Sequence, residues 1–549
     1  MRIAEAILRY LKVNEVEYIF GISAGTVSAI FDAVNDVGIK PIITKNEAGA
    51  AYAAVKYASA SEKLGVCIAA GGVGTNNMIN GIADAMRSKI PTLIITGYVH
   101  RWQIGKGAIQ ELDTKNILKP ITKYSQTVLD EKKVLATLQK AIQIALTPPY
   151  GPVHISIPID IQVAPLMEQI PDKVQLPSDM YKDAEISIKK AIKIIDREKH
   201  GLIMVGKGCR GLSRQVMDLS EHLQWPIITT PQGKGVVPAD FYLNLGNYGF
   251  AGTDTATNYV ESGPETCLLI LGSSLGESST RNYNPVLVDG RKVIHVDWDE
   301  EQLGKVFNAD VMIHHDLSYT IPEIIKGTKR ALDRFNKVKI ENPYIQNHTG
   351  LSLRLFLDKI TKVMPTNTYY VSDIGEYMNF LFKYMEIPEG GDFEISLNYG
   401  AMGSGVAGVI GTHLAQTQRP VAVFTGDGSF FMNGSEILTA KEYRMPILYF
   451  VINNAMLGYV ENGHRYLYGR TVKGFKQERI SISAMMNAVG VKSMQISELE
   501  EIDQIKHFVR QNEGPWVIEL ITDGSEAAPV ADRFKALEET KNVKEEKVC

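Results

Sequence analysis

Two short apolar segments near the end of the chain constrain its fold more than any other feature. Residues 421–425 (VAVFT) lead into Gly426-Asp427-Gly428, and residues 447–452 (ILYFVI) lead into Asn453-Asn454. Both segments have the length and composition of strands that are buried on both faces of a parallel sheet. Because doubly wound sheets bind ligands at the carboxyl ends of their strands, Asp427 and Asn454 are predicted to lie together at such an edge.

The side chains at these predicted strand ends suit a metal-bound phosphate. Asp427 and Asn454 each offer a hard oxygen, and Mg²⁺ takes few protein ligands because water and phosphate complete its octahedron. The small residues Gly428 and Ser429 follow, and such a turn lets a diphosphate approach backbone N–H groups at a helix start. The spacing therefore predicts a metal-bridged diphosphate, although an Asp-Gly pair taken alone is more typical of a plain turn.

Short apolar runs alternate with helical patterns along almost the whole chain, which favours parallel sheets joined by crossover helices. We predict an α/β protein of three doubly wound parallel-sheet domains. The predicted domains are residues 1–165, 185–330 and 350–530, with connecting segments near 164–183 and 326–347 and a solvated, mixed-charge tail at 538–547.

Composition excludes several classes of partner. The 549 residues are 45% hydrophobic and 22% charged with a formal net charge of −4, which gives no sign of a nucleic acid or an anionic membrane. No apolar run reaches about 18 residues, and the first residues lack the layout of a signal peptide. Cys67, Cys209, Cys267 and Cys549 match no zinc or redox spacing, so we expect buried, reduced thiols in a cytoplasmic enzyme.

The segment from Gly426 to Asn454 resembles the signature of thiamine diphosphate (ThDP) enzymes, and further matches extend over essentially the whole chain apart from the tail. The resemblance implies the ThDP-binding fold, with a pyrimidine-binding, a middle and a diphosphate-binding domain in that order. It implies ThDP and Mg²⁺ as cofactors, with the carbonyl of Met456 as a third protein ligand of the metal beside Asp427 and Asn454. It also implies a homodimer or homotetramer, because such active sites form between the pyrimidine domain of one subunit and the diphosphate domain of another.

Glu47 follows an apolar segment and opens a helix of small residues, where the helix dipole alone favours a carboxylate. Residues 45–55 (KNEAGAAYAAV) also resemble the family segment whose glutamate hydrogen-bonds N1′ of the cofactor's pyrimidine ring. A carboxyl group in an apolar pocket favours its protonated form, so it can share a proton with a ring nitrogen. The resemblance makes Glu47 the predicted proton relay, which promotes the imino tautomer that removes the thiazolium C2 proton.

Residues 398–405 (NYGAMGSG) would permit tight helix–sheet packing, and they also resemble the family segment that lies beneath the cofactor. In that segment a bulky apolar residue forces the bent form of the cofactor, and a glycine carbonyl receives its 4′-amino group. The matching positions are Met402 and Gly400. Met402 would therefore act by positioning rather than by chemistry.

Residues 70–77 (AGGVGTNN) are typical of a tight turn between a strand and a helix. They also resemble a cofactor-binding loop of the acetolactate synthase branch, with Val73 where proline is usual and with Asn77 at its end. Gln110 corresponds to a glutamine that faces the reacting substrate, where a side-chain amide can donate to a carboxylate or a tetrahedral oxygen. The alternative for Gln110 is a surface turn.

Several residues depart from the biosynthetic acetohydroxyacid synthases. Gly463 stands where a tryptophan sorts the acceptor keto acids, Ile109 replaces a phenylalanine and Gly107 replaces an aspartate. Residues 272–280 (GSSLGESST) replace an arginine-rich flavin-binding segment, which makes bound FAD doubtful. Glu376 stands near the diphosphate where glutamine and histidine are frequent, and it would repel phosphate unless its side chain points away.

The sequence thus predicts an acetolactate synthase-like carboligase that decarboxylates a 2-oxo acid such as pyruvate and ligates the acyl carbanion to a second carbonyl. The cofactor's thiazolium ring would accept the electrons released as CO₂ leaves. The alternatives are a non-oxidative decarboxylase or a carbon–carbon lyase that releases an aldehyde and, from another class, a catalytically silent ThDP-binding protein. The joint presence of Glu47, Asp427, Asn454 and Met402 argues against a silent protein, because a mere binder needs no proton relay.

Overall fold

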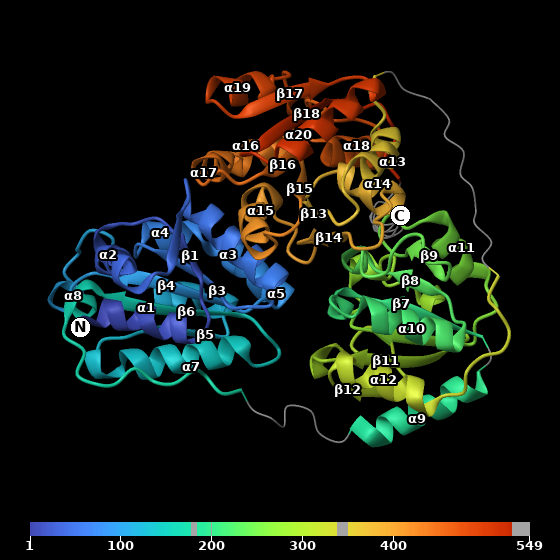
Figure 1. Cartoon of the computed structure of the whole chain (residues 1–549), viewed down its shortest axis with the longest axis horizontal. Coiled ribbons are helices and arrows are strands. Elements are labelled where there is room, and N and C mark those ends of the chain that lie inside the picture. The colour runs from blue at the N-terminus through green and yellow to red at the C-terminus, as the bar shows by residue number, and fades with distance from the viewer. Residues whose placement is uncertain (177–183, 199, 337–349, 530–549) are drawn as a thin grey trace, which may run out of the picture.

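The computed structural model describes residues 1–176, 184–198, 200–336 and 350–529, and the predicted tail and parts of both predicted connecting segments lie outside them. The described residues form three six-stranded sheets, and all their strand pairs are parallel (Figure 1). We call these sheets with their flanking helices the first, middle and third units. The predicted fold class, three doubly wound α/β units, is confirmed.

The first unit has the strand order β2-β1-β3-β4-β6-β5. Its strands are β1 Tyr18–Gly21, β2 Lys40–Ile43, β3 Gly65–Ala69, β4 Thr92–Tyr98, β5 Tyr124–Thr127 and β6 Pro152–Pro158. Its helices are α1 Ile3–Val13, α2 Ser28–Val37, α3 Glu47–Ser61, α4 Val73–Asn77, α5 Ile79–Ser88, α6 Thr114–Leu118, α7 Val134–Leu146 and α8 Ile159–Val163. Strands β3 and β6 are buried along their whole length, as their apolar sequences predict.

The middle unit has the strand order β12-β11-β10-β7-β8-β9. Its strands are β7 Gly201–Val205, β8 Ile227–Thr229, β9 Asn244–Asn247, β10 Cys267–Leu271, β11 Lys292–Asp297 and β12 Val311–His314. Its helices are α9 Ala184–Arg197, α10 Ser213–Leu223, α11 Asp254–Ser262 and α12 Leu317–Gly327. The strand order reverses between β7 and β10, which is where an open α/β sheet ordinarily binds a ligand.

The third unit has the strand order β14-β13-β15-β16-β18-β17. Its strands are β13 Tyr369–Ser372, β14 Asp392–Ile395, β15 Val421–Gly426, β16 Ile447–Asn453, β17 Lys492–Ile496 and β18 Trp516–Ile521. Its helices are α13 Leu353–Val363, α14 Tyr377–Tyr384, α15 Ser404–Ala415, α16 Asp427–Asn433, α17 Glu436–Glu442, α18 Gly458–Tyr468, α19 Ile482–Ala488 and α20 Ile505–Gln511. Strands β15 and β16 are neighbours, with Gly426 paired to Ile452, so Asp427 and Asn454 leave the sheet at the same edge.

Helices α3 and α15 join the first and third units, and Figure 1 shows them side by side between the two sheets. Small residues on both helices permit this close approach. A Cβ atom built at Gly411 of α15 would overlap the carbonyl oxygen of Ala53 on α3. Residues of both units therefore share one apolar core, to which Ala50 and Ala54 contribute on one side and Val406 on the other.

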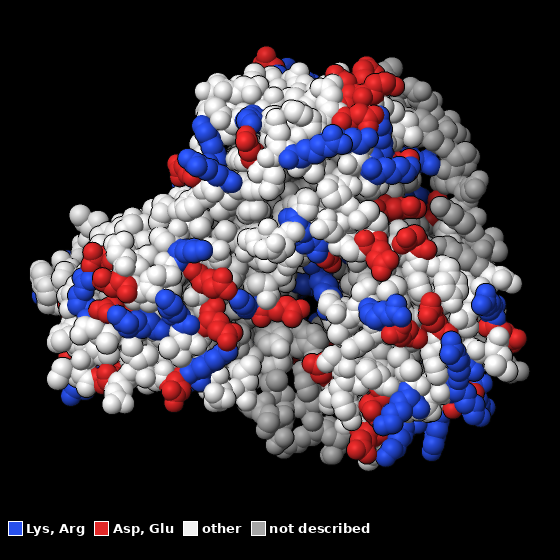
Figure 2. Space-filling model, in the orientation of Figure 1, with Lys and Arg blue, Asp and Glu red and all other residues white. Residues whose placement is uncertain are grey.

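Three of the four cysteines, Cys67, Cys209 and Cys267, are free thiols in buried positions, as expected, and Cys549 lies outside the described residues. Figure 2 shows lysine and arginine side chains interspersed with aspartate and glutamate over the visible face, without a large field of one sign. Among the described helices, none combines the length and the apolar character that crossing a bilayer requires.

Candidate active site

A pocket lies at the carboxyl ends of β15 and β16, where the sequence predicts the diphosphate site. Its walls include the junction of β15 with the first turn of α16, the residues after β16 and the first turn of α18. The predicted site residues in its lining are Met402, Gly426, Asp427, Gly428, Ser429, Asn454 and Met456.

Asp427 is held rigidly at this edge. It is 8% exposed, and its two carboxylate oxygens accept hydrogen bonds from the backbone N–H groups of Gly428 and Ala455, each at 2.8 Å. Burial raises the pKa of Asp427, and these two donors oppose the rise. The carboxylate thus connects the end of β15 to the loop after β16 and faces the pocket with its charge only partly compensated.

The donor set of the pocket fits a hard divalent cation. Asn454 Oδ1 lies on the same wall, where it accepts a hydrogen bond from Met456 N at 3.2 Å. Asp427, Asn454 and the backbone of Met456 supply only oxygen ligands, and Mg²⁺ prefers oxygen and needs few protein ligands. These three residues could therefore hold Mg²⁺ together with a diphosphate.

Met402 lies over the turn that would receive the diphosphate. A Cβ atom built at Gly428 would meet Met402 Cε at 3.2 Å, so the two residues approach each other closely. Gly400 has φ +74°, a conformation that favours glycine, and it is exposed and does not line the pocket.

The loop that carries Met402 and Gly400 is fixed by the buried Asp373, which accepts hydrogen bonds from Gly403 N and Val406 N at 2.9 and 3.0 Å. Burial raises the pKa of Asp373 to about 6.

Glu376 lines the pocket, and its side chain turns toward α18. One of its oxygens accepts a hydrogen bond from Asn462 Nδ2, and a Cβ atom at Gly458 would overlap the other oxygen. Burial raises the pKa of Glu376, and the Asn462 bond opposes the rise. The structure thus gives Glu376 a partner on α18 that the sequence did not reveal, and Gly458 leaves room for its carboxylate.

The remaining predicted residues form a second group on the first unit. Glu47 is half-buried at the start of α3, and Asn77 Nδ2 donates a hydrogen bond to Glu47 Oε2 at 2.9 Å. A Cβ atom at Gly74 would lie 3.3 Å from the other oxygen of Glu47. The glycine loop that follows β3 therefore lies directly against Glu47.

Gln110 rests on the same glycine loop through its backbone. Its φ is +68°, and its carbonyl oxygen would lie 2.9 Å from a Cβ atom built at Gly72. Val73 is 57% exposed and Ile109, next to Gln110, is 89% exposed. This second group, Glu47, Asn77, Val73 and Gln110, thus includes one exposed apolar side chain, Val73, and adjoins another, Ile109.

The two groups do not meet within one chain. In the described part of the chain, every residue that lines the pocket belongs to the third unit, from Leu353 to Glu526. The pocket also contains residues that sequence reasoning missed, among them Leu353, Phe380, Tyr459 and Glu526. Tyr459 could have been predicted from the sequence, because it follows Asn453-Asn454 closely along the chain. No local sequence pattern marks Leu353, Phe380 or Glu526 as site residues.

The carboxylates at the end of β11 act as caps. Asp297 Oδ1 accepts the N–H of Asp299 at 2.9 Å, and Asp299 Oδ1 accepts the N–H of Glu301 at 3.1 Å. Asp299 also forms an ion pair with Lys89 from the first unit. Burial raises the pKa of Asp297 to about 7 and lowers the pKa of Lys89 to about 8. Within the described residues this arrangement is strand-end capping with an ion pair between units.

Three family models match the chain in the order of its three units. They are the thiamine pyrophosphate (TPP) enzyme N-terminal TPP binding domain at residues 1–117, the central domain at 188–324 and the C-terminal TPP binding domain at 373–520. A probable acetolactate synthase large subunit of Methanocaldococcus jannaschii is 30% identical, with 96% of this chain and 93% of that protein covered. The acetolactate synthase isozyme 2 large subunit of Escherichia coli is 27% identical, with 95% of each chain covered.

A solved structure has the same fold. The X-ray structure of a putative thiamin diphosphate-dependent enzyme isolated from Mycobacterium smegmatis matches with a TM-score of 0.81 at 19% identity, covering 95% of this chain and 99% of that one. The chain therefore belongs to the ThDP-dependent enzymes. Within them it is similar to the acetolactate synthase large subunits.

Proposed function

We propose that the chain binds ThDP through Mg²⁺, decarboxylates a 2-oxo acid such as pyruvate and ligates the resulting acyl carbanion to a second carbonyl. The observation that carries this proposal is the pocket in which Asp427, Asn454 and Met456 offer oxygen ligands beside Gly428 and Ser429 in the first turn of α16. The names of the relatives, acetolactate synthase large subunits, support the choice of reaction.

The proposed roles divide between binding and proton transfer. Asp427 Oδ, Asn454 Oδ1 and the carbonyl of Met456 hold Mg²⁺, while Gly426, Gly428 and Ser429 leave space for the diphosphate. When bound, ThDP supplies the electron sink for decarboxylation. Met402 would position the bound cofactor, and the carbonyl oxygen of Gly400 would accept a hydrogen bond from its amino group. Glu47 holds the proton shared with the pyrimidine ring.

We further propose that the second group serves the pocket of another subunit, in a homodimer or homotetramer. Glu47, Val73, Asn77 and Gln110 lie on a surface with exposed Ile109, and α16 beside the pocket exposes Phe431 at 47% and Met432 at 57%. Burying such side chains would favour association, because exposed apolar area is removed from water. In this arrangement Val73 and Asn77 border the cofactor and Gln110 donates to the substrate.

Flavin is not part of the proposal. At the switch point of the middle unit, Gly208 N donates a hydrogen bond to Gly272 O at 2.9 Å. The loops after β7 and β10 thus lie against each other where a ligand would enter. This observation and the sequence of residues 272–280 both favour a middle unit without FAD.

The test incubates the purified protein with ThDP, Mg²⁺ and a panel of 2-oxo acids, and mass spectrometry then identifies the products and any flavin. Acetolactate or acetoin from pyruvate would support the carboligase. Free acetaldehyde as the sole product would favour the alternative, a non-oxidative decarboxylase or lyase. A parallel measurement follows deuterium exchange at C2 of bound ThDP, which Glu47→Gln is expected to slow strongly while the cofactor stays bound.

A further inference from the structure

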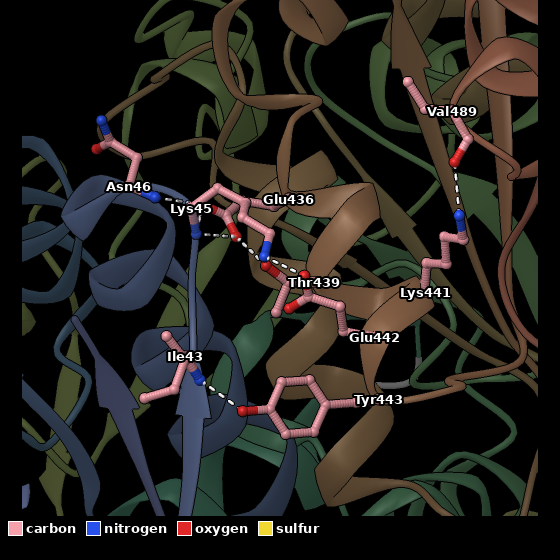
Figure 3. Close-up of polar contacts among 9 residues, drawn as sticks. All are labelled: Ile43, Lys45, Asn46, Glu436, Thr439, Lys441, Glu442, Tyr443 and Val489. Carbon is pink, nitrogen blue, oxygen red and sulfur yellow. Dashed lines mark hydrogen bonds and ion pairs between the residues drawn. The ribbon is translucent and has the colours of Figure 1, made fainter. Parts of the chain in front are cut away.

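Glu436, the first residue of α17, sends its side chain out of the third unit and into the first. Its carboxylate accepts hydrogen bonds from the backbone N–H groups of Lys45, at 3.0 and 3.1 Å to its two oxygens, and of Asn46 at 2.8 Å. The hydroxyl of Thr439, one turn further along α17, donates to it at 2.7 Å. Figure 3 shows this carboxylate at the end of the segment that leads into α3.

The side chain fits its place closely. Glu436 is only 1% exposed, and burial raises its pKa against the opposing effect of Thr439, Lys45 and Asn46. On α3, a Cβ atom at Gly49 would overlap the carboxylate, so glycine is required for this approach. A buried carboxylate that receives this many donors is costly to disturb, because each donor would be left without a partner.

The hydrogen bonds to Glu436 come from Lys45 and Asn46, the two residues that precede Glu47. Asn46 is the N-cap of α3, and its own side chain already accepts the N–H of Ala48 at 2.8 Å. The helix start therefore does not depend on Glu436 for its capping bond. Glu436 instead fixes where the backbone at Lys45 and Asn46 lies, and this sets the position of Glu47.

We propose that Glu436 is a positioning residue for Glu47, so that the third unit of each chain aligns the proton relay carried by its own first unit. The inference rests on the proposed function of Glu47. General acid–base chemistry needs the carboxyl within hydrogen-bond reach of the ring nitrogen, and a misplacement of about 1 Å can cost on the order of 100-fold in rate.

Glu442, the last residue of α17, and Tyr443, which follows it, provide matched controls, because both contact the same segment without touching Asn46. Glu442 forms an exposed ion pair with Lys45 Nζ at 2.6 Å. The hydroxyl of Tyr443 accepts the N–H of Ile43 at 2.8 Å (Figure 3). It also donates to Pro41 O at 3.0 Å. Glu442→Gln removes the charge of the ion pair and Tyr443→Phe removes both hydroxyl hydrogen bonds, while the hydrogen bonds of Glu436 to Lys45 and Asn46 stay intact.

The experiment compares Glu436→Gln with both controls in the full-length protein. Amide hydrogen exchange by mass spectrometry reports on residues 43–50 without cofactor, and deuterium exchange at C2 reports on bound ThDP. For Glu436→Gln we expect the Lys45 and Asn46 amides to exchange at least about tenfold faster, since one side-chain oxygen is replaced by a donor. We expect C2 exchange to slow by about tenfold or more, against about twofold or less in the controls.

Gly49→Ala disturbs the same contact from the other side and serves as the second variant if Glu436→Gln does not fold. The proposal is overturned if residues 43–50 and C2 exchange behave in these variants as in Glu442→Gln. It is also overturned if amide exchange rises evenly over all of α3 and α15, because that would mean a general loss of packing. Failure of the proposed function is distinct, since the parent protein would then show no C2 exchange while the amide comparison still reports on Glu436.

Discussion

Lys56 on α3 and Glu394 on β14 form an ion pair of 3.2 Å that water scarcely reaches, since their side chains are 2% and 3% exposed. The hydroxyl of Tyr369 also donates to Glu394, and Arg210 of the middle unit donates in turn to Tyr369. Burial acts to raise the pKa of Glu394, but the cations Lys56, Arg210 and Lys207 outweigh it and lower the pKa to about 2. All three units thus meet at one buried carboxylate.

Glu394→Gln is expected to destabilise the protein markedly, because Lys56 and Arg210 would keep their buried charges without the compensating anion. Breaking a buried pair in this way costs about 3–5 kcal/mol. The thermal midpoint should fall clearly below that of Glu513→Gln, which removes an exposed pair with Lys492 worth less than about 1 kcal/mol. Equal midpoints for the two variants would contradict this view of the junction.

Gly411→Ala should separate α3 from α15, because the added methyl group would overlap the carbonyl oxygen of Ala53. Overpacking of this kind costs about 1–3 kcal/mol, even though alanine favours the helix. Thermal unfolding of the variant measures the loss. Gly474→Ala, where nothing lies within 4 Å of the new methyl group, is the control and should unfold like the parent.

Asp427→Asn keeps the shape of the side chain and removes its charge, so it should weaken Mg²⁺-dependent binding of ThDP. Substitution of outer-shell partners lowers metal affinity about 10–100-fold, and a direct ligand should cost at least as much. Calorimetric titration with ThDP at several Mg²⁺ concentrations measures the effect. An affinity that still rises with Mg²⁺ as in the parent would exclude Asp427 as a ligand.

Asp297→Asn should change how stability depends on pH. Because the folded-state pKa of Asp297 is raised to about 7, its contribution is fully present at low pH and is lost as the pH rises through about 7. Asparagine can still accept the N–H of Asp299 and never ionises. Since the loss begins near the ordinary pKa of 3.8 and is complete only above about 7, the variant should gain more thermal stability relative to the parent at pH 8 than at pH 5. Equal differences at both pH values would be the contrary result.

Much of the fold could be predicted because buried parallel strands leave a strong local signal. The apolar runs at 421–425 and 447–452 form β15 and β16. Their parallel pairing was predictable because strands that alternate with helices are usually joined by crossover connections. Polar strands are different. Strand β5, Tyr124–Thr127, is half-buried throughout and carries no continuous apolar run, so nothing local distinguishes it from a loop.

The contacts around the site could be predicted only in part. The ends of adjacent strands bring Asp427 and Asn454 into one pocket by geometry alone. The partners of Glu436 and Glu376 could not be predicted, because Lys45 lies 391 residues from Glu436 and Asn462 lies 86 residues from Glu376. Such pairs depend on how units and helices pack, and packing of this kind leaves no trace in local sequence.

In the proposed arrangement Glu47 on the first unit of one subunit serves the pocket on the third unit of another, so two inactive variants should rescue each other. A mixed dimer of Asp427→Asn and Glu47→Gln chains would carry both lesions in one of its two active centres and none in the other. Subunit exchange between the two purified variants should therefore restore up to about a quarter of the parent's turnover, since half of the randomly reassociated dimers are mixed and each has one intact centre.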